Sequence, residues 1–144
     1  MSNEQRYIEF RIYRLNPGVQ IEFHNLVERH SIPMLAAVGM DVVAYGPVPG
    51  IEDGYVLIRA YDSPEQLQMS QDEFYSSDAW RLGPRDAILG LIESHESHEA
   101  WYSPSMLESI VSIMEKAQIA NPLGPELPNL GIKRGSDFRL LKST

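Results

Sequence analysis

The stretch RYIEFRIYRLNPG, residues 6–18, alternates apolar with charged or phenolic side chains. Ile8, Phe10 and Ile12 recur at every second position, and charged or phenolic side chains stand between them. Because successive side chains of a β-strand point to opposite faces, this pattern predicts a strand with one apolar and one polar face. The Asn-Pro-Gly at 16–18 ends the strand, since these residues favour a turn.

Helix and strand signals alternate along the rest of the chain to residue 102. Residues 19–38 repeat apolar side chains at spacings of three and four, which predicts an amphipathic helix that Pro33 kinks. Ser63 and Pro64 are a helix start, because serine caps the first turn and proline fits it. The remaining expected elements are strands at 40–46, 55–61 and 91–102, and helices at 64–75 and 79–89.

The order strand-helix-strand-strand-helix-strand predicts an α+β fold of the ferredoxin-like βαββαβ type, with an antiparallel sheet and helices on one face. We expect this domain at residues 1–102, followed at 103–144 by a C-terminal helix and an irregular tail. The helices are expected on the apolar face formed by Ile8, Phe10, Ile12, Val56, Ile58 and Ala60. The opposite face, with Glu9, Arg11, Tyr13, Arg59 and Tyr61, would then have no helix.

That uncovered face would expose a large aromatic and aliphatic surface to water, which is unusual for a protein that remains a monomer. The residues that form this surface are Tyr7, Tyr13, Tyr55, Leu57 and Tyr61. A second copy of the sheet, packed on it about a two-fold axis, would cover these side chains. The sequence therefore predicts a homodimer, which could assemble further.

Composition narrows the class of protein. The 144 residues suffice for one domain, and the absence of cysteine excludes disulfides, thiolate nucleophiles and cysteine-ligated metals. A net charge of −8 argues against nucleic-acid binding. No apolar run is long enough for a membrane span and no secretory signal is visible, so we expect a cytoplasmic protein.

Charge is unevenly distributed along the chain. Residues 127–144 carry Lys133, Arg134, Arg139 and Lys142 against a single Asp137, a charge of +3 that leaves −11 on the other 126 residues. A basic tail on an acidic body can fold back onto it, bind a partner's body, or remain solvated.

Several of these stretches resemble the NIPSNAP family, which belongs to the dimeric α+β barrel superfamily. The resemblance rests on YIEFRIYRLNPG, RHSIPMLAAVG and YVLIRAYDSPEQ, followed by Asp78 and Trp80, and it covers residues 6–102. It implies a ferredoxin-like fold and a homodimer in which two sheets close one barrel. Residues 103–144 have no counterpart in it.

His30 is the candidate catalytic residue. It lies within the apolar stripe of the first helix, so its imidazole is expected between helix and sheet, where members of the superfamily hold small ligands. A histidine tuned by burial can act as a general base near neutral pH. The alternative is a buried histidine that is hydrogen-bonded to a backbone carbonyl.

The candidate ligand-binding residues are Arg11, Tyr13, Arg59, Tyr61, Trp80 and His95. Arginine forks suit a carboxylate or phosphate, so these residues could bind an anionic ligand. The interpretation that we favour is an internal ion-pair network, because Glu9 is a partner already present on this face. Trp80 could line a pocket for a hydrophobic ligand or belong to the core.

His95-Glu96-Ser97-His98 invites a metal hypothesis. Side chains three apart on a strand point to opposite faces, so the two histidines cannot share a metal within one subunit. We therefore predict no metal site and no cofactor; haem or metal binding through either histidine is a weaker third possibility. His95 could instead meet Glu9 or Arg11, or fill a dimer interface.

Two functions follow from these observations. One is a small-molecule-binding or protein-interaction module without catalysis. The other is a cofactor-independent enzyme, monooxygenase- or isomerase-like, that acts on a hydrophobic small molecule with His30 as general base. A cavity between sheet and helices large enough for a ligand would favour the enzyme, and a filled layer would favour the module.

Overall fold

The computed structural model describes residues 5–48 and 50–120, and these residues form the predicted ferredoxin-like α+β fold. A four-stranded antiparallel sheet has the order β2-β3-β1-β4. Its strands are β1 (Arg6–Leu15), β2 (Asp41–Pro47), β3 (Gly54–Tyr61) and β4 (Ile92–Tyr102). The helices are α1 (Gln20–Leu26), the π-helix η1 (Val27–Ser31), α2 (Ile32–Ala37), α3 (Pro64–Tyr75), α4 (Asp78–Arg81), α5 (Arg85–Leu89) and α6 (Pro104–Ala120). The predicted irregular and basic tail lies outside the described residues.

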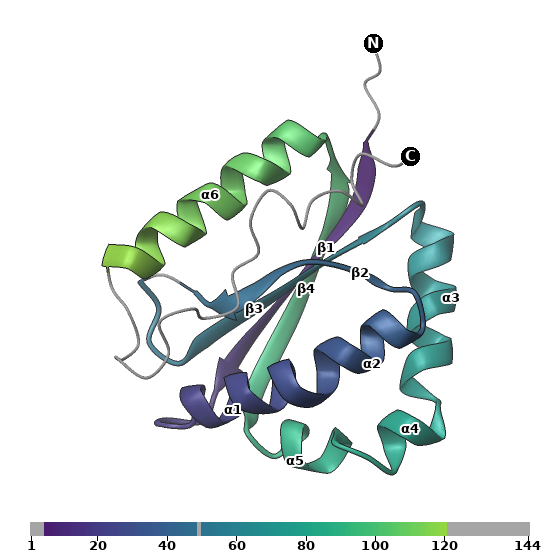
Figure 1. Cartoon of the computed structure of the whole chain (residues 1–144), viewed down its shortest axis with the longest axis vertical. Coiled ribbons are helices and arrows are strands. Elements are labelled where there is room, and N and C mark those ends of the chain that lie inside the picture. The colour runs from purple at the N-terminus through teal and green to yellow at the C-terminus, as the bar shows by residue number, and fades with distance from the viewer. Residues whose placement is uncertain (1–4, 49, 121–144) are drawn as a thin grey trace.

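Helices cover both faces of the sheet (Figure 1). Helices α1 to α5 lie on one face and α6 lies on the other. The first layer buries an aromatic core that includes Phe23, Tyr45, Tyr55, Tyr61, Phe74 and Trp80. The second buries an aliphatic core in which Leu107, Val111 and Met114 of α6 pack on Ile8, Val43, Ala44, Val56, Ile58 and Ala60.

The prediction of which face α1 to α5 cover is wrong. Tyr55, Leu57 and Tyr61 belong to the core under these helices, whereas Ile8 and Ile58 pack against α6. The physical reason is that the first layer brings aromatic rings, which pack on tyrosines and enclose the charged groups between them. The apolar stripe of α6 fits the purely aliphatic face. The polar face is therefore covered within one chain, so it needs no second copy.

The first long helix is interrupted by the π-turn η1. Pro33 has no N–H to donate to the carbonyl four residues earlier, and the turn before it widens. Residues at a constant spacing of four, namely Phe23, Val27, Ser31 and Leu35, consequently face the sheet and are buried. The irregularity expected near Pro33 is thus present, and it shifts the helix face that meets the sheet.

The predicted bounds of α3 are confirmed, whereas the helix expected at 79–89 is divided into α4 and α5 at Gly83 and Pro84. Ser63 Oγ accepts a hydrogen bond from the Gln66 amide at 3.0 Å and caps α3. Gly39 follows α2 with φ of +81°, a conformation that glycine adopts without strain. These caps fix where α2 and α3 leave the sheet, and so they fix the layer that contains the candidate site.

Candidate functional site

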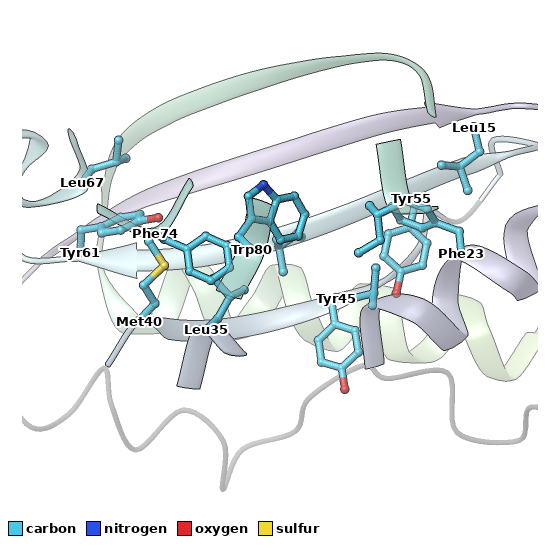
Figure 2. Close-up of a cluster of buried hydrophobic side chains, with 13 residues drawn as sticks. Leu15, Phe23, Leu35, Met40, Tyr45, Tyr55, Tyr61, Leu67, Phe74 and Trp80 are labelled. Atoms are coloured by element: carbon cyan, nitrogen blue, oxygen red, sulfur yellow. The ribbon is translucent and has the colours of Figure 1, made fainter. Parts of the chain in front are cut away.

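An apolar cavity lies between the sheet and helices α1 to α5. It is lined by Tyr13, Phe23, Val27, Ser31, Leu35, Tyr55, Leu57, Phe74, Tyr75, Trp80 and Ile88. Figure 2 shows Trp80 in the middle of this layer, with Phe74 on one side and Phe23 and Tyr55 on the other. The space that a water-sized sphere can occupy is about 30 Å³, enough for one or two waters. The layer is therefore nearly filled.

A buried ion network adjoins this cavity. Glu9 Oε1 accepts hydrogen bonds from Arg59 Nε at 2.9 Å and from the Tyr61 hydroxyl at 3.2 Å. Glu9 Oε2 accepts from Arg11 Nε at 3.3 Å and Nη2 at 3.1 Å. Glu9 and Arg59 are 1% and 0% exposed, so these charges are out of contact with water. Arg11, Arg59 and Tyr61, which were expected on one face of the sheet, all contact Glu9, and with the two arginines Glu9 forms the internal ion-pair network that the sequence favoured.

The network has two guanidinium groups for one carboxylate. Among the described residues, Arg11 and Arg59 form ion pairs with Glu9 and with no other carboxylate. Arg59 Nη2 lies 2.9 Å from Glu9 Oε1 but makes no hydrogen bond there, because the geometry is out of line. The cluster therefore carries one uncompensated positive charge, and the Arg11 side chain, 16% exposed, connects it to solvent.

Tyr75 links the ion network to the cavity. Its hydroxyl accepts a hydrogen bond from Arg59 Nη1 at 3.0 Å. Arg11 and Arg59 lie 5.7 and 5.8 Å from the centre of its ring, within the range of cation–π attraction. The same ring forms part of the cavity wall. An anionic group bound by Arg11 and Arg59 would therefore lie next to the aromatic cavity.

The pKa values of these groups follow from burial and from the neighbouring charges. Burial by itself would raise the pKa of Glu9, but Arg59 and Arg11 offset this effect and hold the pKa below its usual value. Burial raises the pKa of Tyr13 to about 12. At neutral pH the cluster thus consists of an ionised carboxylate, two guanidinium ions and neutral phenols.

A second polar chain begins at Tyr55, on another side of the cavity. The Tyr55 hydroxyl lies 2.6 Å from Nδ1 of His24, which is fully buried. Nε2 of His24 is 3.4 Å from Glu28 Oε1, and the Glu28 side chain is 46% exposed. Burial lowers the pKa of His24, although Glu28 opposes this shift, and burial raises the pKa of Tyr55. Tyr55, His24 and Glu28 therefore join the cavity wall to the surface.

His30 does not face the sheet, and this prediction is wrong. Its side chain is exposed and lines a shallow surface hollow with Ile21 and Arg29. Because of the π-turn, Ser31 faces the sheet in place of His30 and is buried. The buried histidine of this segment is His24, about one and a half turns earlier. The spacing of 24, 27 and 31 by three and four also fits an amphipathic stripe, and that signal could have identified His24.

The other candidate residues lie in two places. Trp80 is buried and lines the cavity, whereas His95 is exposed on β4 beside Tyr13, with ring centres 6.1 Å apart. The expected contact of His95 with Glu9 or Arg11 is absent, because Tyr13 is its register partner on β1. His98 pairs with Phe10 on the opposite face. No group of three or more potential metal ligands occurs among residues 5–48 and 50–120.

The fold and the layered site define a ferredoxin-like α+β protein. The sequence profile of the NIPSNAP family matches residues 8–104. The chain belongs to the NIPSNAP family. Family members similar to it are themselves uncharacterised.

Solved structures share this fold. A NIPSNAP family protein from Agrobacterium tumefaciens is 22% identical with a TM-score of 0.62, over 66% of this chain and 90% of that one. A second protein of this family from the same organism, of unknown function, is 22% identical with a TM-score of 0.63, over 71% and 92%. A putative antibiotic biosynthesis monooxygenase from Bordetella bronchiseptica is 15% identical with a TM-score of 0.54, over 67% and 96%. These likenesses show the fold alone.

Two further comparisons complete the description. The sequence matches none of the curated proteins to which it was compared. Within the described part of the chain, no helix combines the length and apolar character that crossing a membrane requires.

Proposed function

We propose that this protein is a small-molecule-binding module whose ligand has an apolar body and one carboxylate. The observation that carries the proposal is the pair of arginines that share Glu9 beside an aromatic cavity. A carboxylate at Arg11 and Arg59 would neutralise the surplus charge, and guanidinium forks bind carboxylates with matched geometry.

The charge of the site favours a carboxylate over a phosphate monoester. The surplus is one positive charge, which one carboxylate balances. A phosphate monoester carries about −1.5 to −2 at neutral pH and would leave unpaired negative charge next to buried Glu9. The apolar body of the ligand would occupy the space beside Tyr75 and Trp80.

Ligand entry requires the cavity to widen from its water-sized volume. Two short helices, α4 and α5, supply Trp80 and Ile88 to its wall. Helices of four and five residues depend on packing for their stability, because so short a helix gains little from its own hydrogen bonds. We expect these two helices to move when ligand binds.

The test uses benzoate as an anionic probe and benzamide as its neutral counterpart. NMR titration follows the Nε–Hε signals of Arg11 and Arg59 in the full chain. Benzoate should shift both signals in a saturable way, and benzamide should bind at least tenfold more weakly. Arg11→Gln should weaken benzoate binding at least tenfold, because the solvent-connected fork is lost. Arg14→Gln, which removes an exposed charge from the same strand, should leave it unchanged.

Each failure has a distinct meaning in this experiment. Equal binding of benzoate and benzamide, unaffected by Arg11→Gln, would leave a binding module but refute the carboxylate. Failure of benzoate to bind, together with no retained small molecule in a native mass spectrum of the purified protein, would refute the binding module.

The Tyr55–His24–Glu28 chain favours a second candidate, a cofactor-independent enzyme. Here His24 takes the general-base role that the sequence suggested for His30, because it connects the cavity wall to the surface. Similarity in fold to a putative monooxygenase supports this candidate at the level of fold only. A molecule retained by the protein should then be converted on aerobic incubation, and His24→Asn should stop conversion while retention persists.

We also propose that the protein acts as a homodimer. The tyrosine-rich face no longer supports this proposal, since helices α1 to α5 cover it. What supports it is the open edge of the sheet at β4, where nine consecutive residues from Glu93 to Trp101 are exposed. Light scattering during size-exclusion chromatography should give twice the mass of the chain.

A further inference from the structure

Tyr55 is the residue at which the Tyr55–His24–Glu28 chain meets the aromatic cavity. Its side chain lines the cavity, and His24, which is fully buried on α1, lies behind it. A ligand in the cavity would therefore contact the tyrosine, and the histidine would act on it through the phenol. Whether the Tyr55 oxygen offers a ligand a donor or an acceptor depends on where the phenolic proton lies.

Glu28 determines which nitrogen of His24 carries the proton. Glu28 Oε1 lies 3.4 Å from Nε2 of the histidine, and Glu28 Oε2 accepts a hydrogen bond from the Tyr45 hydroxyl at 3.1 Å. An ionised carboxylate accepts hydrogen bonds and donates none, so a lone pair on Nε2 would face negative charge, whereas a hydrogen there is attracted to it. Because burial lowers the pKa of His24, the ring is neutral at neutral pH and has a single N–H. This hydrogen lies on Nε2, which leaves Nδ1 as an acceptor.

The Tyr55 hydroxyl consequently donates its hydrogen to Nδ1 of His24, at 2.6 Å. Burial raises the pKa of Tyr55 well above its usual value, so the phenol keeps this proton at neutral pH. A hydroxyl oxygen that has donated its hydrogen still accepts hydrogen bonds through its lone pairs. Tyr55 thus offers an acceptor to a ligand in the cavity. A donor on the ligand satisfies this acceptor, whereas an ether oxygen in the same place would leave two acceptors facing each other.

The Tyr55 acceptor is separate from the arginine pair that would hold a carboxylate. Tyr55 and Arg59 lie four residues apart on β3 and point to the same face of the sheet, so their Cα atoms are about 13 Å apart. Figure 2 shows Tyr55 beside Phe23, on the opposite side of Trp80 from Phe74. A ligand that reaches both polar groups consequently carries its donor at the end opposite to its carboxylate.

We propose that the ligand of this protein is a hydroxyaryl carboxylate whose hydroxyl group, at the end remote from the carboxylate, donates a hydrogen bond to Tyr55. This ligand class rests on the proposed function for its carboxylate and apolar body, and it adds the group at the other end. An aromatic body fits the rings of Phe23 and Trp80, which line the same cavity. His24 and Glu28 are positioning residues, because they direct the Tyr55 hydroxyl without contacting the ligand.

The first test determines the tautomer of His24 without any ligand. Long-range proton–nitrogen NMR spectra of the full chain distinguish a protonated ring nitrogen from an unprotonated one, and His24→Asn assigns the signals. At neutral pH, Nε2 should carry the hydrogen and Nδ1 should not. A hydrogen on Nδ1 would overturn the inference, because Tyr55 would then direct its own hydrogen to the ligand and select an acceptor.

The second test compares ligands that differ in one group. The probes para-hydroxyphenylpropionate, para-methoxyphenylpropionate and phenylpropionate share a carboxylate and one ring, and isothermal titration calorimetry measures their affinities for the full chain. The hydroxy acid should bind about fivefold more tightly than phenylpropionate, because it gains a buried hydrogen bond. The methyl ether should bind at least tenfold more weakly than the hydroxy acid, since its oxygen has no hydrogen to donate.

A matched pair of variants assigns this preference to Tyr55. Tyr55→Phe removes the acceptor and keeps the ring, so it should reduce the affinity for the hydroxy acid about fivefold and leave that for phenylpropionate unchanged. Tyr102→Phe removes a hydroxyl beside the aliphatic core, on the other face of the sheet, and should change neither affinity. A preference for the hydroxy acid that persists in Tyr55→Phe would overturn the inference.

Phenol and anisole separate this inference from the proposed function, because neither carries a carboxylate. Phenol should bind more tightly than anisole, and Tyr55→Phe should abolish the difference. If it does so while benzoate fails to bind, the carboxylate is refuted and the hydroxyl donor is retained. If benzoate binds but neither pair of probes shows a preference for the hydroxyl group, the proposed function stands and the inference is overturned. Binding of none of these probes would overturn both.

Discussion

At the scale of single residues, the site depends on groups that are buried in one protonation state. Glu9 is held ionised by Arg59 and Arg11, and His24 is held neutral because it is enclosed between helix and sheet. In both cases the pKa in the folded protein is lower than in the unfolded chain. Both residues therefore make the free energy of unfolding depend on pH in the same direction.

We predict that acidification destabilises the protein in two stages. Below the ordinary histidine pKa of 6.5, the unfolded chain takes up a proton at His24 before the folded protein does, so stability falls. Below 4.5 the same argument applies to Glu9, and stability falls further. Each group contributes at most about 1.4 kcal/mol per pH unit. Urea unfolding at pH 7.5, 5.5 and 4.0 measures both stages.

His24→Asn separates the two stages. Asparagine retains an acceptor for Tyr55 but does not titrate, so the variant should lose the first stage and keep the second. His30→Asn is the matched control, because it removes an exposed histidine from the same helical segment. An unchanged first stage in His24→Asn would contradict the assignment of this residue.

At the scale of elements, the π-turn η1 decides which side chains reach the sheet. The residues at 19, 23, 26, 27, 30, 34 and 38, all apolar except His30, suggested one regular helix face. One wide turn rotates the following helix, so that Leu35 is 2% exposed while Met34 is only partly buried. Sequence periodicity assumes a constant rotation per residue, and it fails where a π-turn changes that rotation.

Truncating each of these two side chains tests the helix phase. Leu35→Ala should lower the free energy of unfolding by about 2 to 5 kcal/mol, because it removes a buried side chain and enlarges the cavity. Met34→Ala should lower the free energy of unfolding by about 1 kcal/mol or less, because the side chain that it truncates is only partly buried. Chemical denaturation measures both values. A larger loss for Met34→Ala would mean that the helix continues without the π-turn.

At the scale of the whole molecule, one sheet separates two cores. The aromatic core contains the candidate site, whereas the aliphatic core under α6 supports it from behind. Figure 1 shows α6 alone across the second face. Because Val111 on α6 is 1% exposed and Ile113 is 66% exposed, the two sides of this helix have different roles.

Introducing an aspartate on the buried side or on the exposed side of α6 tests which side packs on the sheet. Val111→Asp places a carboxylate in the aliphatic core, where no described cation can pair with it, and should cost about 3 kcal/mol or more. Ile113→Asp should change stability by less than about 0.5 kcal/mol. Thermal and urea unfolding of the full chain measure the stability of both variants. Equal effects would show that α6 does not pack on the sheet through Val111.

Periodicity, prolines and caps act locally, so the sequence predicted the four strands, α3 and α6, the order of the elements and the class of the sheet. It also predicted that Arg11, Arg59 and Tyr61 share one face of the sheet, since strand alternation places them there. Which layer covered that face was decided by tertiary packing, because both faces of the sheet are apolar enough to be buried. The choice of His24 over His30 likewise arose from the π-turn before Pro33, because the wider turn changes the rotation per residue that regular helix periodicity assumes.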